Sequence, residues 1–127
     1  AKLKNDELLY LQACDKYKTA TELNPKNDDA FDNWGAALAS LSKLKNNQNL
    51  LLDSIDKLTT AVELGVSPYN LACAYALLGD KPNALDFLKK TLQEKSQTID
   101  FVLQDEDWKD YLEDADFKAL IEKYKGA

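Results

Sequence analysis

Residues 67–93 read SPYNLACAYALLGDKPNALDFLKKTLQ, and small side chains recur there among large ones at helical spacing. Gly79 interrupts the apolar pattern, and Pro82 follows where a new helix can begin. Ala72 and Ala84 lie on either side of this break. The stretch therefore predicts two short helices joined by a tight turn, with small residues where the two helices must approach closely.

The rest of the chain shows the same spacing, with breaks at LNPKNDD, KNNQN, ELGVSP and LLGDKPN. Apolar residues recur every three or four positions, and no stretch alternates apolar and polar residues as a strand would. We therefore expect an all-α protein. The expected helices run from about Asp6 to Leu23, from Asp28 or Asp29 through Leu41, from Leu51 to a stop at Gly65, from Tyr69 to Leu78, and onward from a cap at Asp80.

The chain also repeats itself. DAFDNWGAALASL aligns with VSPYNLACAYALL, which places Asn33 on Asn70 and Gly35 on Ala72. The following helices align as well, as DSIDKLTTAVEL with NALDFLKKTLQE. These matches indicate a helical hairpin repeated with a period of about 34 residues.

This pattern resembles the tetratricopeptide repeat, whose first helix carries a large-x-x-Leu-Gly-x-x-Tyr signature. The resemblance implies antiparallel hairpins stacked as a short right-handed superhelix. Residues 1–127 would then form a single domain with a partial first repeat (1–27), a second repeat (28–64), a third repeat (65–96) and an acidic, helical capping segment (97–127). The second repeat has about seven extra residues around LSKLKNNQNLL, roughly two helical turns. The alternative is an unrelated antiparallel helical bundle. The matching residues are Phe31, Trp34, Gly35 and Leu38 in the second repeat, and Leu71, Ala72, Tyr75, Gly79, Ala84 and Leu88 in the third.

The small residues are expected where helices cross, because larger side chains there would force the helices apart. Trp34 and Leu71 are expected in the core between helices, so that Trp34→Ala would cost about 3–5 kcal/mol. The expected crossing positions are Gly35 and Ala72, the opposing Ala13, Ser54 and Ala84, and Ala20, Ala61 and Thr91 where the next repeat packs.

Composition bears on the function. The net charge is −6, and all 16 basic residues are Lys, which argues against nucleic-acid binding. The absence of His and of a Gly-rich loop argues against an enzyme and against a bound cofactor. DEDWKDYLEDAD fails as a calcium loop because Asp110 occupies the sixth position, so no metal is expected.

The location is also inferred from sequence. No apolar run is long enough to span a membrane. Cys14 and Cys73 could form one bridge, but each lies within an apolar helical pattern; as small buried residues they favour a reducing, cytoplasmic compartment. No secretory signal is visible, although the chain starts at Ala1 without Met and a removed segment stays open.

The resemblance implies that the first helices of the hairpins line a groove that binds a protein segment. Asn33 and Asn70 match the family's groove asparagine, although either could instead bond neighbouring backbone. Asp29 and Asp32 favour a segment with Lys or Arg. The family's clamp for a C-terminal carboxylate needs basic residues where this chain has Asp32, Ala36 and Val66, so that kind of binding is not expected. The implied groove residues are Asp29, Asp32, Asn33, Ala36, Ala39 and Ser40, with Val66, Tyr69, Asn70, Cys73, Ala76 and Leu77.

The leading functional hypothesis is therefore an adaptor or scaffold module that binds a peptide segment, as a monomer or weak homo-oligomer. The second is a structural or self-associating solenoid segment, because Leu8, Leu9 and Leu11 are expected to be partly bare. The third, an enzyme, has the least support.

Overall fold

The computed structural model describes residues 2–126, with side chains from Asp6 onward, and over that range it is helical without a strand. The expected all-α class is confirmed. The chain divides into two compact units, of which the N-terminal unit ends at Val66 and the C-terminal unit begins at Ser67. This division lies two residues from the expected boundary between the second and third repeats.

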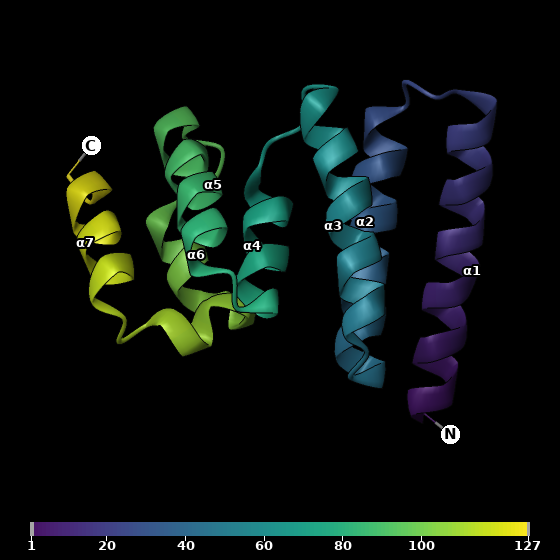
Figure 1. The fold of residues 1–127 in the computed structure, drawn as a ribbon, viewed down its shortest axis with the longest axis horizontal. Helices are drawn as coiled ribbons and strands as arrows, with labels where there is room; N and C mark the ends of the chain where they lie inside the picture. The colour runs from purple at the N-terminus through teal and green to yellow at the C-terminus, as the bar shows by residue number, and fades with distance from the viewer. Residues whose placement is uncertain (1, 127) are drawn as a thin grey trace. The chain divides into compact units, whose positions relative to one another are not determined.

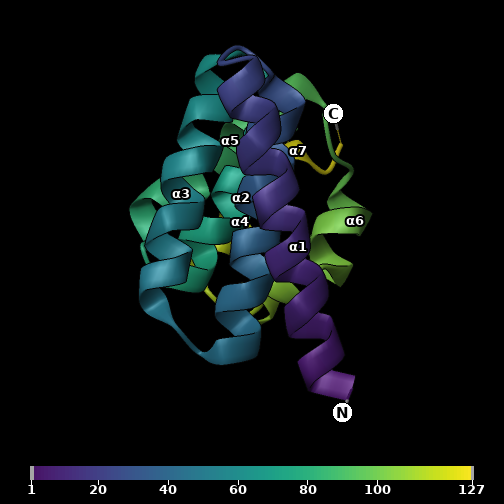
Figure 2. The same cartoon turned by 90° about the vertical axis from the view of Figure 1, so that its right-hand side faces the viewer.

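The N-terminal unit consists of α1 (Lys2–Leu23), α2 (Asp28–Lys45) and α3 (Gln48–Glu63). Short connections make consecutive helices antiparallel, and α2 packs against both α1 and α3 (Figure 1). Figure 2 shows the same unit with α1 facing the viewer. Helix α1 begins earlier than expected. Residues 2–5 contain no helix breaker, so the helix extends through them. They also lack the apolar periodicity from which a helix is predicted.

The extra residues of the second repeat lengthen its helices instead of forming a loop. Helix α2 ends at a two-residue turn, in which Asn46 adopts the left-handed conformation with φ 50°. Asn47 then caps α3, because its Oδ1 accepts from the N–H groups of Asn49 and Leu50 at 2.9 and 3.3 Å. Asparagine tolerates both positions better than most residues, which explains the NNQN break.

Helices α2 and α3 cross closely at Gly35. A Cβ atom built on Gly35 would overlap the Leu58 side chain. The Ser54 hydroxyl donates to the Gly35 carbonyl oxygen at 2.6 Å, within the buried contact. The expected close crossing at Gly35 and Ser54 is confirmed.

The C-terminal unit consists of α4 (Tyr69–Leu78), α5 (Lys81–Glu94), α6 (Ile99–Gln104), the 3₁₀ helix η1 (Glu106–Tyr111) and α7 (Ala115–Tyr124). Gly79 ends α4 with φ 86°, and Asp80 accepts from the Asn83 N–H at 3.2 Å, as the sequence predicts. In the same hairpin the rings of Tyr75 and Phe87 stack, with centroids 5.8 Å apart.

One hydrophobic core joins the α4–α5 hairpin to the segments that follow it. Trp108 and Phe117 are almost completely buried in it, and their rings stack at 5.6 Å. Helix η1 packs against α4, and α7 packs against α5. The core residues are Tyr69, Ala72, Cys73, Ala76, Ala84, Leu88, Leu92, Val102, Trp108, Tyr111, Phe117 and Ile121.

The structure corrects one expected core residue. Leu71 is buried as predicted, with 2% of its surface exposed, but Trp34 is only partly buried. The Trp34 ring stacks on Phe31 at 6.3 Å, and the Lys57 ammonium lies 4.6 Å from the ring centre. Trp34 therefore covers the edge of the α2–α3 contact, and Leu58 fills its centre with 1% exposure. Both cysteines are free; Cys73 is buried as expected, whereas Cys14 is only partly buried.

Candidate functional site

The residues predicted to line a groove on α2 form one row along the helix. Asp29, Asn33, Ala36 and Ser40 follow one another at steps of three or four, so they share a face. Asp29 and Asn33 are exposed, and Ala36 and Ser40 are partly exposed. We call these four residues the α2 row. The predicted Asp32 lies beside it, partly buried and engaged in an interaction of its own.

The α2 row is acidic at one end. Asp28 and Asp29 both lie in the first turn of α2, where the helix dipole favours negative charge. The Asp29 N–H donates to Asp28 Oδ1 at 2.7 Å, which fixes one carboxylate at the helix start. The basic residues of α2, Lys43 and Lys45, lie in its last turn. A segment bound along the row would therefore meet acidic groups at one end and small side chains beyond them.

The predicted groove residues on α4 are in a different environment. Tyr69 and Cys73 are buried, with 6% and 5% of their surface exposed, whereas Asn70 and Leu77 are partly exposed. The Tyr69 hydroxyl donates to Asp105 Oδ2 at 2.6 Å, and the Phe101 ring meets the Tyr69 ring edge-on at 5.8 Å. A peptide can touch Tyr69 and Cys73 only after α6 and η1 have moved away. The α4 part of the groove therefore stays a prediction, and it requires that α6 and η1 move away first.

The contact of η1 with α4 has no signal in the sequence. Asp105 is recognisable as a helix cap from its spacing, and it does cap η1 by accepting from the Asp107 N–H at 3.0 Å. Its second partner, Tyr69, is 36 positions away, and nothing in the spacing of either residue points to the other. The spacing of residues therefore does not predict that the acidic segment lies on α4.

Burial keeps the Tyr69 hydroxyl and the Cys73 thiol protonated. Burial raises the pKa of the Tyr69 hydroxyl, and the neighbouring Cys73 and Asp105 raise it further. Burial likewise raises the pKa of the Cys73 thiol, with the charges of Asp105 and Asp107 adding to the effect. Both groups therefore hold their protons at neutral pH, and Cys73 is neither a thiolate nucleophile nor a ready metal ligand.

Three potential metal ligands meet in the same place. The Cys73 sulfur and one oxygen each of Asp105 and Asp107 lie within 4.8 Å of one another. Both oxygens of Asp105 already accept hydrogen bonds, from Tyr69 and from the Asp107 backbone. The Cys73 sulfur also approaches Asp105 Oδ2, at 3.9 Å. This cluster is arranged to tie η1 to α4, and a cation would have to compete with the donors already present.

Helix α1 carries the other notable surface. Leu8, Leu9 and Leu11 are 54%, 62% and 48% exposed, which confirms the expectation that they are partly bare. All three lie within about one turn of α1. An apolar cluster of this kind is typical of a contact with another protein surface.

Across residues 2–126, no helix combines the length and the apolar composition that crossing a membrane requires. Comparisons with models of protein families, with curated proteins and with solved structures gave no match.

Proposed function

We propose that the chain is a tetratricopeptide-like protein-interaction module that binds a segment of a partner protein along the α2 row. The observation that supports the proposal is the exposure of that row to solvent. Asn33 is exposed, and Ala36 and Ser40 beside it are small and partly exposed. Its position in the first helix of an α2–α3 hairpin is the one that the resemblance implies for a binding surface.

The chemistry of the row defines its partner. The Asn33 amide can both donate to and accept from the backbone of an extended segment. Ala36 and Ser40 leave room for the side chains of that segment. Asp28 and Asp29 attract a Lys or Arg at one end of it, so the association rate should fall as salt rises. One short row gives a modest contact, and an affinity near micromolar, about −8 kcal/mol, is expected.

The test begins with a peptide display screen against the intact chain. Selected peptides are then measured by calorimetry with the double variant Asn33→Ala/Ala36→Arg, which removes the amide and obstructs the row. The matched control is Gln12→Ala/Thr19→Arg, which makes the same kind of change at exposed positions of α1. Circular dichroism and melting check that both variants remain folded.

The proposal expects selected peptides to be enriched in Lys or Arg, with binding lost in the α2 variant and retained in the control. Equal binding by both variants would move the site away from α2. A screen that selects no peptide would contradict the function itself.

Self-association is the second candidate, and the exposure of Leu8, Leu9 and Leu11 favours it. Light scattering over a concentration series tests it. A dimer that dissociates in Leu8→Glu/Leu11→Glu and persists in Asn33→Ala/Ala36→Arg would support this candidate. A chain that stays monomeric at all concentrations would remove it.

A cytoplasmic, reducing compartment also remains our proposal. Its support is that Cys14 and Cys73 are both free, and that Cys73 is buried where oxidation is hindered. Fractionation of the source cells followed by immunodetection tests it, and recovery outside the cytoplasm would contradict it.

A further inference from the structure

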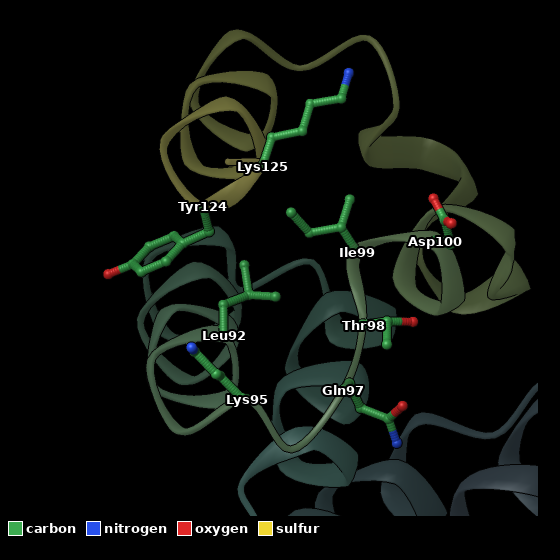
Figure 3. A pocket seen from close by; sticks show the side chains of 8 residues that line it. All are labelled: Leu92, Lys95, Gln97, Thr98, Ile99, Asp100, Tyr124 and Lys125. Carbon is green, nitrogen blue, oxygen red and sulfur yellow. The ribbon is translucent and has the colours of Figure 1, made fainter. Parts of the chain in front are cut away.

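A pocket opens in the C-terminal unit between the end of α5, the start of α6 and the end of α7 (Figure 3). Its volume is about 380 Å³, near the lower end of the range for ligand sites, and it would admit one large side chain. The pocket shares no residue with the α2 row, since all of its lining residues belong to the C-terminal unit. They are Leu92, Lys95, Gln97, Thr98, Ile99, Asp100, Tyr124 and Lys125.

The floor of the pocket is the edge of the hydrophobic core. The side chains of Leu92 and Ile99 point toward the space between their elements (Figure 3). Leu92 is a core residue with 6% exposure, and Ile99 and Tyr124 pack against the core while remaining partly exposed. An apolar side chain entering the pocket would therefore extend the core and lose its contact with water.

The rim of the pocket is basic. Lys95 and Lys125 lie on opposite sides of it (Figure 3). Within the described residues neither lysine makes an ion pair, whereas Lys81, Lys90 and Lys118 of the same unit all do. Asp100 is the one acidic group among the lining residues, and it is exposed.

Lys125 lies within an acidic segment, and Lys95 lies just before it. Residues 97–127 hold nine acidic and four basic side chains, a net charge of −5. A partner with negative charge would gain from contact with Lys95 and Lys125 only at short range, since exposed charges are screened beyond about 8 Å at physiological salt. The arrangement therefore selects acidic groups placed close to the apolar side chain that enters the pocket.

We infer that this pocket binds an acidic peptide segment of a partner protein, which inserts one large apolar side chain between Leu92 and Ile99 and places carboxylates beside Lys95 and Lys125. This binding mode does not rest on the α2 row, whose acidic end favours a segment of opposite charge. Either site can therefore fail without the other.

The probe is the peptide acetyl-Asp-Glu-Phe-Glu-Asp-amide, added to chain labelled at its isoleucine methyl groups. The chain has three isoleucines, Ile55, Ile99 and Ile121, so the spectrum is simple to assign by substitution. Ile99 lines the pocket, and Ile55 of the N-terminal unit is an internal reference. Two further peptides serve as controls, one with Ala in place of Phe and one with Lys in place of every acidic residue.

The matched variants are Lys95→Glu/Lys125→Glu and Lys26→Glu/Lys89→Glu. Both change the net charge equally, and all four positions are exposed. The pocket variant is expected to weaken binding of the acidic peptide by about tenfold or more, whereas the control variant leaves it close to the wild-type value. Melting curves establish that both variants are folded.

The expected result is a saturable shift of the Ile99 methyl signal with the acidic Phe peptide, and no such shift with either control peptide. An unmoved Ile99 signal at millimolar peptide would overturn the inference. So would an equal response to the basic peptide, or binding that survives in Lys95→Glu/Lys125→Glu. A shift of Ile99 that grows with protein concentration alone would assign the pocket to a second copy of the chain and likewise overturn it.

Discussion

The Ser54 hydroxyl on α3 donates to the Gly35 carbonyl oxygen on α2 across 2.6 Å, in a contact from which water is excluded. Because Gly35 has no side chain, the two backbones come close enough for this bond to form. The hydrogen bond thus forms only because Gly35 has no side chain. Substitutions at Ser54 and at Gly35 should therefore change the free energy of unfolding in different ways.

Ser54→Ala is expected to lower the free energy of unfolding by about 0.5–1.5 kcal/mol, the usual net value of one buried hydrogen bond. Chemical denaturation with urea measures the change. Thr60→Ala is the control, because its hydroxyl bonds only within α3 and is exposed to water. Equal losses in the two variants would mean that the bond to Gly35 adds nothing beyond a local contact.

Gly35→Ala is expected to destabilise the N-terminal unit by about 1–3 kcal/mol, since its methyl group would overlap Leu58. The same change in a Leu58→Ala background should cost clearly less, because the overlap with Leu58 is relieved and alanine favours a helix over glycine by about 1 kcal/mol, which leaves only the tight 3.2 Å approach of the new Cβ to the Ser54 backbone oxygen. A double-mutant cycle in urea gives the coupling. If the two substitutions were simply additive, the close crossing would not be the cause of the loss.

Local signals predicted the hairpins well. Gly79, Asp80 and Pro82 specify a turn and a cap within four residues, and the structure places α4 and α5 on either side of them. Gly35 also predicted a close crossing of two helices, because few other roles require glycine inside a helix. The candidate site was less predictable. Its α2 part follows from periodicity. The burial of Tyr69, in contrast, depends on the path of a segment that lies more than 30 residues further along the chain.

The burial of Trp34 shows a second limit of the sequence. Large aromatic residues at repeat positions predict a core, but periodicity cannot separate the centre of a contact from its edge. Trp34 lies at the edge, beneath the Lys57 ammonium, and leaves the centre to Leu58. We therefore expect Trp34→Ala to cost about 1–2 kcal/mol and Leu58→Ala about 2–5 kcal/mol. Urea midpoints rank the two, and a larger loss at Trp34 would reverse this assignment.

An acid-sensitive contact holds α5 to the start of α7. The Lys81 ammonium lies 2.9 Å from Asp114 and 2.7 Å from Asp116, and the pairing with Lys81 lowers the pKa of Asp114. A lowered pKa stabilises the fold above the ordinary aspartate pKa of about 4, and the gain is lost as pH falls through the lowered value. Lys81→Gln should therefore melt below wild type at pH 7, and the two curves should converge in acid. A gap that persists at low pH would contradict this account.

The hydrogen bond between Tyr69 and Asp105 should be lost at alkaline pH instead of at acidic pH. Tyr69→Phe keeps the ring against Phe101 but removes the donor of a 2.6 Å hydrogen bond to a carboxylate, and should cost about 1–2 kcal/mol at pH 7. Burial and the nearby acidic groups raise the pKa of Tyr69. Stability due to the neutral hydroxyl is therefore complete below the ordinary tyrosine pKa of about 10, and is lost as pH rises through the raised value.

The urea midpoint of the wild type should thus fall more steeply above about pH 10 than that of Tyr69→Phe, because only the wild type has this hydroxyl to ionise on unfolding. Tyr10→Phe removes a hydroxyl from the N-terminal unit and is the control. Burial also raises the pKa of Tyr111, so absorbance of the phenolate in the folded chain should show late ionisation of both Tyr69 and Tyr111, and only the part due to Tyr69 should be absent from Tyr69→Phe. If Tyr69→Phe kept the wild-type slope, η1 would not be held on α4 by this bond. Access of a peptide to Tyr69 and Cys73 would then depend on the apolar contacts of α6 and η1 alone.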